Sequence, residues 1–406
     1  MSGTRRLSFN LEDNKESRVT SRNAYTDATL DSNRLALVKR EGGRDFNVIN
    51  ETYLLPTDSE EWNRLDKQHR AITLGLGGLY PAPDVVRAVL APQEGVSKRV
   101  LDLGCGTGIW SIEMAREFPH CYILGIDLAP VPVTGTHLPS NCRFEMNDIC
   151  LGLPQLRDQF DVVFARLIAL GLKDSRQTLA DIQGCLKPGG ILIWIDGDYD
   201  LFSGWPMVYR PFVSSSNPTG SYTVRVCYEL QRSGILGGSD VKTAGEILDE
   251  GFWSNGSLLD PDTCKAASIF LPIEGDQLQR DRLKYIGMLL RQDFIGVTEA
   301  AQKIFLKVGW PKETVDLWIA RMKDECANAT SGMRLRIAWG RRRAASGSPA
   351  PPLPKVVLED TSESIAMGGY PFYEEFDTEE QALAAAVIRN RPKDIPAPPL
   401  PFESTD

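Results

Sequence analysis

Residues 99–108 read RVLDLGCGTG, an apolar run that passes directly into three closely spaced glycines. The apolar run predicts a buried strand, and the glycines predict a tight turn that leads into a helix over residues 109–118. Trp110, Met114 and Phe118 share one face of that helix, and Pro119 ends it. Such a turn exposes backbone N–H groups and lets a ligand approach closely. The stretch therefore predicts a strand, turn and helix unit of a ligand-binding α/β sheet.

Further apolar runs follow at the spacing expected of strands. They occupy residues 121–127, 142–148, 160–166 and 191–196. Helical segments between them, such as 178–186, predict a parallel, doubly wound sheet. Two later runs, 264–273 and 333–340, predict two more strands. The helical patterns that separate these two, at 277–305 and 312–327, predict a helical cap inserted before the last strand.

The glycine turn differs from the turn that binds dinucleotides. In the GxGxxG pattern the third glycine comes one residue later than Gly108, and Ile109 fills that place here. Asp102 stands two residues before Gly104, where a carboxylate would repel a pyrophosphate. A ligand that carries an ammonium group and a sulfonium charge would suit this acid. The turn therefore predicts binding of S-adenosylmethionine.

Acidic residues also follow the next two strands. Asp127 ends the second strand, where an acid accepts hydrogen bonds from ribose hydroxyls in sheets of this kind. Asp148 ends the third strand and is expected to accept from the adenine amino group. Arg166, which ends the fourth strand, either faces the cofactor carboxylate or the acceptor, or forms a structural salt bridge. The predicted cofactor site comprises Asp102, Leu103, Gly104, Cys105, Gly106, Thr107, Gly108, Asp127, Leu128, Asp148, Ile149 and Arg166.

The ordered set of motifs from residue 100 to 196 resembles class I S-adenosylmethionine-dependent methyltransferases. A narrower resemblance, to the LaeA-like fungal methyltransferases, covers roughly residues 50–341. It rests on YxLP from Tyr53, RLDxQH from Arg64, GIDLAPVPV and LKPGG. The resemblance implies a Rossmann-like, doubly wound, seven-stranded sheet, S-adenosylmethionine as cofactor, and a role in secondary metabolism.

The sequence departs from the family pattern at three places near the expected acceptor side. The family usually has tryptophan at His137 and Asp-Trp at Asp174-Ser175, and often glutamate at Ile193. The acceptor therefore stays open between a small secondary metabolite and a protein. The competing hypothesis is a regulatory protein of the same fold that binds the cofactor and partner proteins with little or no turnover.

Methyl transfer requires a general base only when the acceptor is protonated. His69, on a predicted helix over 58–74, is the candidate catalytic residue, and the alternative is a histidine that packs on the sheet and bonds a carbonyl. Asp196 and Asp198 are either bases or the polar end of a strand. Four aromatic residues either line an acceptor pocket or belong to the core: Trp205, Tyr209, Trp253 and Trp310.

The composition excludes several classes of protein. Of 406 residues, 45 are basic and 54 acidic, a net charge of -9, which argues against non-specific binding to nucleic acid or an anionic membrane. Eight cysteines without a CxxC pair and three histidines predict free thiols and no metal site. Because no apolar run is long enough for a membrane span or a secretory signal, we expect a cytoplasmic or nuclear protein.

The two ends of the chain differ from its middle. Residues 1–45 are expected to be disordered, and a methyltransferase domain is expected over 46–343. Within it we distinguish lid helices at 46–95, a cofactor-binding half at 96–198 and the helical insert at 276–330. Residues 344–406 are expected to form a Pro-rich, mostly disordered tail with one helix at 378–389. Its two APPLP segments, at 350–354 and 397–401, are either ligands for a WW-type domain or stiff spacers.

Overall fold

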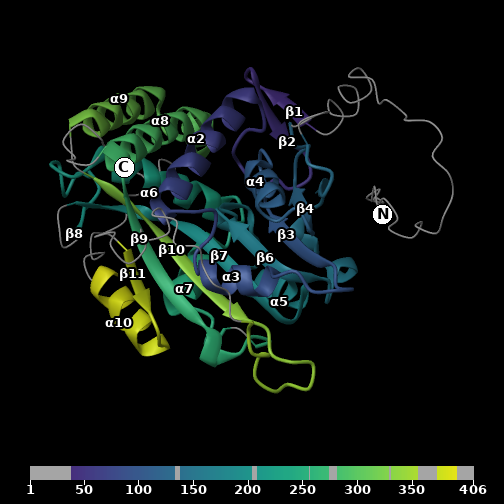
Figure 1. The fold of residues 1–406 in the computed structure, drawn as a ribbon. Coiled ribbons are helices and arrows are strands. Elements are labelled where there is room, and N and C mark those ends of the chain that lie inside the picture. The colour runs from purple at the N-terminus through teal and green to yellow at the C-terminus, as the bar shows by residue number, and fades with distance from the viewer. Residues whose placement is uncertain are drawn as a thin grey trace, which may run out of the picture. The chain divides into compact units, whose positions relative to one another are not determined.

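The computed structural model describes residues 38–132, 138–203, 208–255, 257–273, 281–328, 331–354 and 373–390. Within these residues the central feature is a nine-stranded sheet with the strand order β11-β9-β10-β7-β6-β3-β4-β5, in which β8 pairs with β7 (Figure 1). The strands are β3 (Lys98–Leu103), β4 (Cys121–Asp127), β5 (Cys142–Met146), β6 (Phe160–Arg166), β7 (Leu186–Ser203), β8 (Val208–Tyr209), β9 (Lys265–Pro272), β10 (Gly332–Arg341) and β11 (Tyr373–Phe376).

The sheet has a switch point at β3. The chain passes from β3 to β4 and β5 on one side and returns to β6 and β7 on the other, and these five strands run parallel. The next strand, β10, runs antiparallel between β7 and β9. This order confirms the predicted Rossmann-like, doubly wound sheet of seven main strands, to which the short strands β8 and β11 are added. Ligands of such sheets bind outside the carboxyl ends of the strands at the switch point.

Helices cover both faces of the sheet, which explains why its strands are apolar along their whole length. On one face α3 (Pro83–Leu90) and α4 (Ile109–Glu117) share an apolar cluster with Val100 and Phe164. On the other face α5 (Ser175–Gly184) and α7 (Val241–Glu250) share a cluster with Leu101 and Trp194. Short helical turns complete these connections: η2 (Ile149–Leu151), η3 (Pro154–Leu156), η4 (Ala169–Gly171) and η5 (Pro261–Thr263).

The predicted cap lies between β9 and β10. It consists of α8 (Asp281–Val308) and α9 (Lys312–Asn328), which pack against α6 (Tyr222–Leu236) and one another. The guanidinium of Arg225 lies over the rings of Trp310 and Trp318, 5.3 and 4.5 Å from their centroids, and bonds the buried Glu229. Trp310 is therefore part of the cap's core. A further helix, α2 (Ser59–Leu76), lies along α8 (Figure 1).

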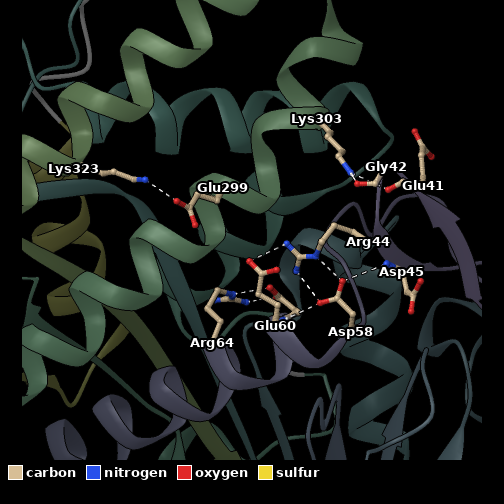
Figure 2. A network of polar contacts seen from close by, with 11 residues as sticks. Glu41, Gly42, Arg44, Asp45, Asp58, Glu60, Arg64, Glu299, Lys303 and Lys323 are labelled. Carbon is tan, nitrogen blue, oxygen red and sulfur yellow. Dashed lines mark hydrogen bonds and ion pairs between the residues drawn. The ribbon is translucent and has the colours of Figure 1, made fainter.

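The first described residues correct our expectation for residues 38–45. A hairpin, β1 (Val38–Glu41) and β2 (Arg44–Asn47), replaces the expected disorder there. Gly42 and Gly43 have φ of 58° and 85° and form its turn. Figure 2 shows that Arg44 bonds the N-cap residue of α2, Asp58, through both oxygens, at 2.6 and 2.9 Å. The sequence did not predict this hairpin because its stability comes from contacts with α2 and α8. Residues 1–37 lie outside the described residues.

In the described part of the tail, the helix expected at 378–389 is present as α10 (Glu379–Asn390), and a strand and loop contacts accompany it. Strand β11 pairs with β9 at the sheet edge, and α10 packs against α7. The first APPLP segment lies against the domain, because Ala350 N–H donates to Asp260 and the Pro351 carbonyl accepts from Arg341, both at 2.7 Å. The second APPLP segment lies outside the described residues. No helix among the described residues combines the length and apolar character needed to cross a membrane.

Candidate functional site

The glycine turn joins β3 to α4 and is fixed against the end of β4. Gly104, Gly106 and Gly108 have φ of 67°, 56° and 76°, which other residues adopt only with strain. The N–H groups of Gly104 and Cys105 donate to the Ile126 carbonyl, at 2.8 and 3.0 Å. The Gly106 N–H donates to the carboxylate of Asp127 at 2.8 Å. The glycines are therefore required for a turn that also orients the acid of the neighbouring strand.

Three acids lie at the carboxyl ends of β3, β4 and β5. Asp102 is 3% exposed, accepts from the Ser111 hydroxyl at 2.6 Å, and has a pKa that burial raises to about 6. Burial also raises the pKa of Asp127, whose second oxygen accepts from the Ala129 N–H at 3.0 Å. Asp148 caps η2 by accepting from the Cys150 N–H at 3.0 Å. The structure thus brings together the acids that were predicted from separate strands.

These acids line a cavity of about 260 Å³. Ten of the twelve predicted cofactor residues form part of its wall: Asp102, Gly104, Cys105, Gly106, Thr107, Asp127, Leu128, Asp148, Ile149 and Arg166. The other two do not. Leu103 is fully buried in the apolar cluster beneath α5, and Gly108 occupies the N-cap of α4. The side chain of Leu103 points away because alternate residues of a strand face opposite sides, and Gly108 serves the helix start; a part in cofactor binding stays a prediction for both.

Helix α2 covers the glycine turn and forms another wall of the cavity. The Thr107 hydroxyl donates to Asp66 at 2.7 Å, and a Cβ on Gly106 would lie 3.3 Å from Leu65. Trp62, Leu65 and Gln68 line the cavity. The amphipathic helix that the sequence predicted before the sheet therefore lies across the ligand-binding edge.

His69 does not take the position that a general base requires. It is 2% exposed and is absent from the cavity wall. Its Nδ1 accepts from Arg166 at 3.0 Å, and its Nε2 bonds Glu113 at 2.9 Å. Because a guanidinium can only donate, Nδ1 carries no proton and Nε2 does. Both nitrogens are engaged, which favours the alternative of a histidine held by structural contacts, and a role for His69 as a base stays a prediction.

Arg166 lies between His69 and the cavity. Burial lowers its pKa to about 10, against the favourable charges of Asp102 and Glu113. Among the described residues its only hydrogen-bond partner is His69, so its remaining N–H groups are available to a ligand. An arginine and a buried acid on one wall match the carboxylate and ammonium groups of a free amino acid.

Sequence reasoning missed a charged group on the opposite wall. Arg64 of α2 donates to Glu61 and, at 2.5 Å, to Asp293 of α8. The amide of Gln68 donates to both oxygens of Asp293, at 3.3 and 3.2 Å. All four side chains line the cavity. The sequence did contain one indication of this group: Asp293 is an acid among the buried, mostly apolar residues of a long helix. Its partner could not be named from the sequence, because that partner, Arg64, lies on α2.

The remaining candidates that the structure describes are either bound by other protein groups or absent from the cavity wall. Asp196 lines the cavity but accepts from the backbone of Ala169 and Gly197, both at 2.9 Å. Asp198 also lines it, paired with Arg334 and Arg336 of β10. Tyr209 and Trp253 are absent from the wall, and Trp205 lies outside the described residues. The wall instead carries aromatic residues that were not predicted, including Tyr53, Tyr199 and Phe294. All eight cysteines are free thiols, as predicted.

Comparison with known proteins agrees with this geometry. Residues 95–210 match a family described as a methyltransferase domain. The chain is 41% identical over 165 residues to the secondary metabolism regulator laeA of Coprinopsis cinerea, a match that covers 40% of each protein. It is 33% identical to methyltransferase str2 of Strobilurus tenacellus over 37% of this chain and 52% of that one. Methyltransferase pytC of Aspergillus terreus is 28% identical over 68% of this chain and 78% of its own.

The chain thus spans about half or less of the length of the first two of these relatives. Among solved structures, phosphoethanolamine N-methyltransferase 2 of Haemonchus contortus, in complex with S-adenosylhomocysteine, is 14% identical over 78% of this chain and 73% of that one, with a TM-score of 0.34. The strand order and the matched methyltransferase domain together show that the chain contains a class I methyltransferase domain, and 40% of its length is similar to a laeA protein.

Proposed function

We propose that the protein transfers a methyl group from S-adenosylmethionine to an acceptor in fungal secondary metabolism. The observation that carries this proposal is the pairing of Asp102 and Arg166 on the wall of one cavity beside the glycine turn. Within the described residues, no cation donates a hydrogen bond to Asp102, whose pKa burial raises to about 6, and no carboxylate accepts one from Arg166. The amino-acid end of S-adenosylmethionine supplies both.

The residues around the cavity fit the rest of the cofactor. Asp127 and Asp148 each keep unused lone pairs toward the cavity, where ribose hydroxyls and an adenine amino group are donors. Leu128 and Ile149 follow these acids and provide apolar contact on either side of a flat base. The bound cofactor supplies the methyl group as part of a sulfonium, which an acceptor attacks in line.

The protein's part in the reaction is to position the reactants and exclude water. Helix α2 closes the cavity over the glycine turn, and Gln68, Tyr199 and Phe294 form the wall available to the acceptor. Of the described residues, no histidine lines the cavity, and burial raises the pKa values of Tyr53 and Tyr199. We therefore propose that transfer relies on proximity and on an acceptor that needs little help with deprotonation.

Two roles remain for this chemistry. The names of pytC and str2 favour a tailoring step on a small metabolite, and the name of the laeA relative favours a regulator that acts with partner proteins. A WW-type partner for residues 350–354 would require this segment to leave Asp260 and Arg341. We propose the enzyme first, because the cavity continues beyond the predicted cofactor residues to the wall formed by α2 and α8.

The test is a labelled-methyl assay with the full chain and cell extract, separated into small-molecule and protein fractions. Wild type should transfer label, and Asp127→Ala should not. Glu94→Gln, an exposed substitution in the loop between α3 and β3, is the matched control and should transfer like wild type. Calorimetry should show binding of S-adenosylmethionine and not of NAD. Tight NAD binding, or no binding of S-adenosylmethionine, would refute the proposal, and cofactor binding without label in either fraction would favour the regulator.

A further inference from the structure

His69 belongs to the lid helix α2 but contacts two other elements. Its Nε2 bonds Glu113 of α4, and its Nδ1 accepts from Nη2 of Arg166 at the end of β6. The Thr73 hydroxyl, one turn later in α2, lies 3.4 Å from Nε2. With 2% of its side chain exposed, the imidazole is held in one orientation. It therefore links the lid to the strand that carries the cavity's arginine.

Arg166 depends on this link for its orientation. An arginine side chain has several rotatable bonds, and ordering them requires fixed partners. Here Phe164 lies under the guanidinium, 6.0 Å from its ring centroid, and His69 accepts one N–H. No other hydrogen bond to Arg166 occurs within the described residues. His69 therefore decides where the free N–H groups of Arg166 point within the cavity.

We propose that His69 is a positioning residue that aims Arg166 at the carboxylate of the bound cofactor and so couples closure of α2 to the amino-acid end of that cofactor. This inference rests on the proposed function. The charged groups around the imidazole fit the role. Glu113 accepts a hydrogen bond from Nε2–H, Arg166 donates to Nδ1, and Asp66 of α2 accepts from the Thr107 hydroxyl. Burial lowers the pKa of His69, which keeps Nδ1 able to accept.

The test compares two ligands that differ only in the amino-acid end. S-adenosylhomocysteine carries the carboxylate and ammonium groups, and 5′-methylthioadenosine lacks both. Calorimetry on the full chain should show that His69→Phe weakens S-adenosylhomocysteine by about three- to tenfold, the scale of one lost hydrogen bond, and leaves 5′-methylthioadenosine unchanged. His69→Gln, whose amide oxygen can accept from Arg166, should recover part of the loss.

A double-mutant cycle with Arg166→Gln separates positioning from packing. Once Arg166 is replaced, His69→Phe should cause no further loss of S-adenosylhomocysteine affinity. Equal weakening of both ligands, or a full His69→Phe effect in the Arg166→Gln background, would overturn the proposal. Failure of wild type to bind S-adenosylhomocysteine would refute the proposed function instead. If His69→Phe does not fold, Glu113→Ala at a half-buried site removes the acceptor of Nε2–H and should give the same ligand-selective loss, and equal or absent effects there would also overturn it.

Discussion

Replacing Asp102 by asparagine should stabilise the free protein while weakening its binding of S-adenosylmethionine. Burial raises the pKa of Asp102 from 3.8 to about 6, so the charged form is disfavoured in the folded state. A shift of this size costs the folded state about 3 kcal/mol of stability at pH 7; this cost is absent below pH ~4, grows as the pH rises and is complete above pH ~6. Asparagine keeps an oxygen that can accept from Ser111 and removes the charge.

Urea unfolding at pH 5 and pH 7.5, with and without S-adenosylmethionine, measures both effects. Asp102→Asn should unfold at higher urea than wild type at pH 7.5, and the difference should shrink at pH 5. Its cofactor affinity should fall by about 1.5–3 kcal/mol, the scale of a hydrogen bond to a charged group. Wild-type affinity should also fall as pH drops below about 6, because Asp102 then takes up a proton. Glu94→Gln, which removes an exposed charge, should unfold and bind the cofactor like wild type at both pH values. A destabilised Asp102→Asn that still binds the cofactor normally would refute the reasoning.

Two further substitutions and one truncation test the site and the fold. Asp127→Ala should weaken binding of S-adenosylmethionine by about 1.5–3 kcal/mol in calorimetry, since the carboxylate also fixes the Gly106 N–H, and an unchanged affinity would contradict this. Gly104→Ala should lower the free energy of unfolding by at least about 2 kcal/mol, because φ is 67° and the new Cβ would lie 2.5 Å from Ile168. Truncation after residue 354 removes β11 and α10 and should lower the melting temperature by about 2–4 °C for each kcal/mol of unfolding free energy that is lost. An unchanged melting temperature would show that the tail does not stabilise the domain.

The parallel half of the sheet was predictable because each strand carries its own evidence. Both faces of β3, β4 and β6 are covered, so these strands appear as continuous apolar runs between turns. The hairpin β1–β2 and strand β11 have no such pattern. Four-residue strands at an edge gain their stability from partners distant in the chain, Asp58 for the hairpin and β9 for the tail. Composition alone marks these segments as loops.

In the site, too, some residues were predictable from the local sequence and others depended on contacts between distant parts of the chain. Acids that follow strands were predictable, since every parallel strand ends at one edge of the sheet. Gln68 and His69 were not separable, because neighbours on a helix differ by about 100° in direction and only the docking of α2 decides which one faces the cavity. Gln68 faces it and holds Asp293, and His69 faces α4 and β6. The histidine's chemistry suggested a base, but its direction makes it a partner of Arg166. Its influence on the reaction therefore acts through the arginine's orientation rather than through a proton.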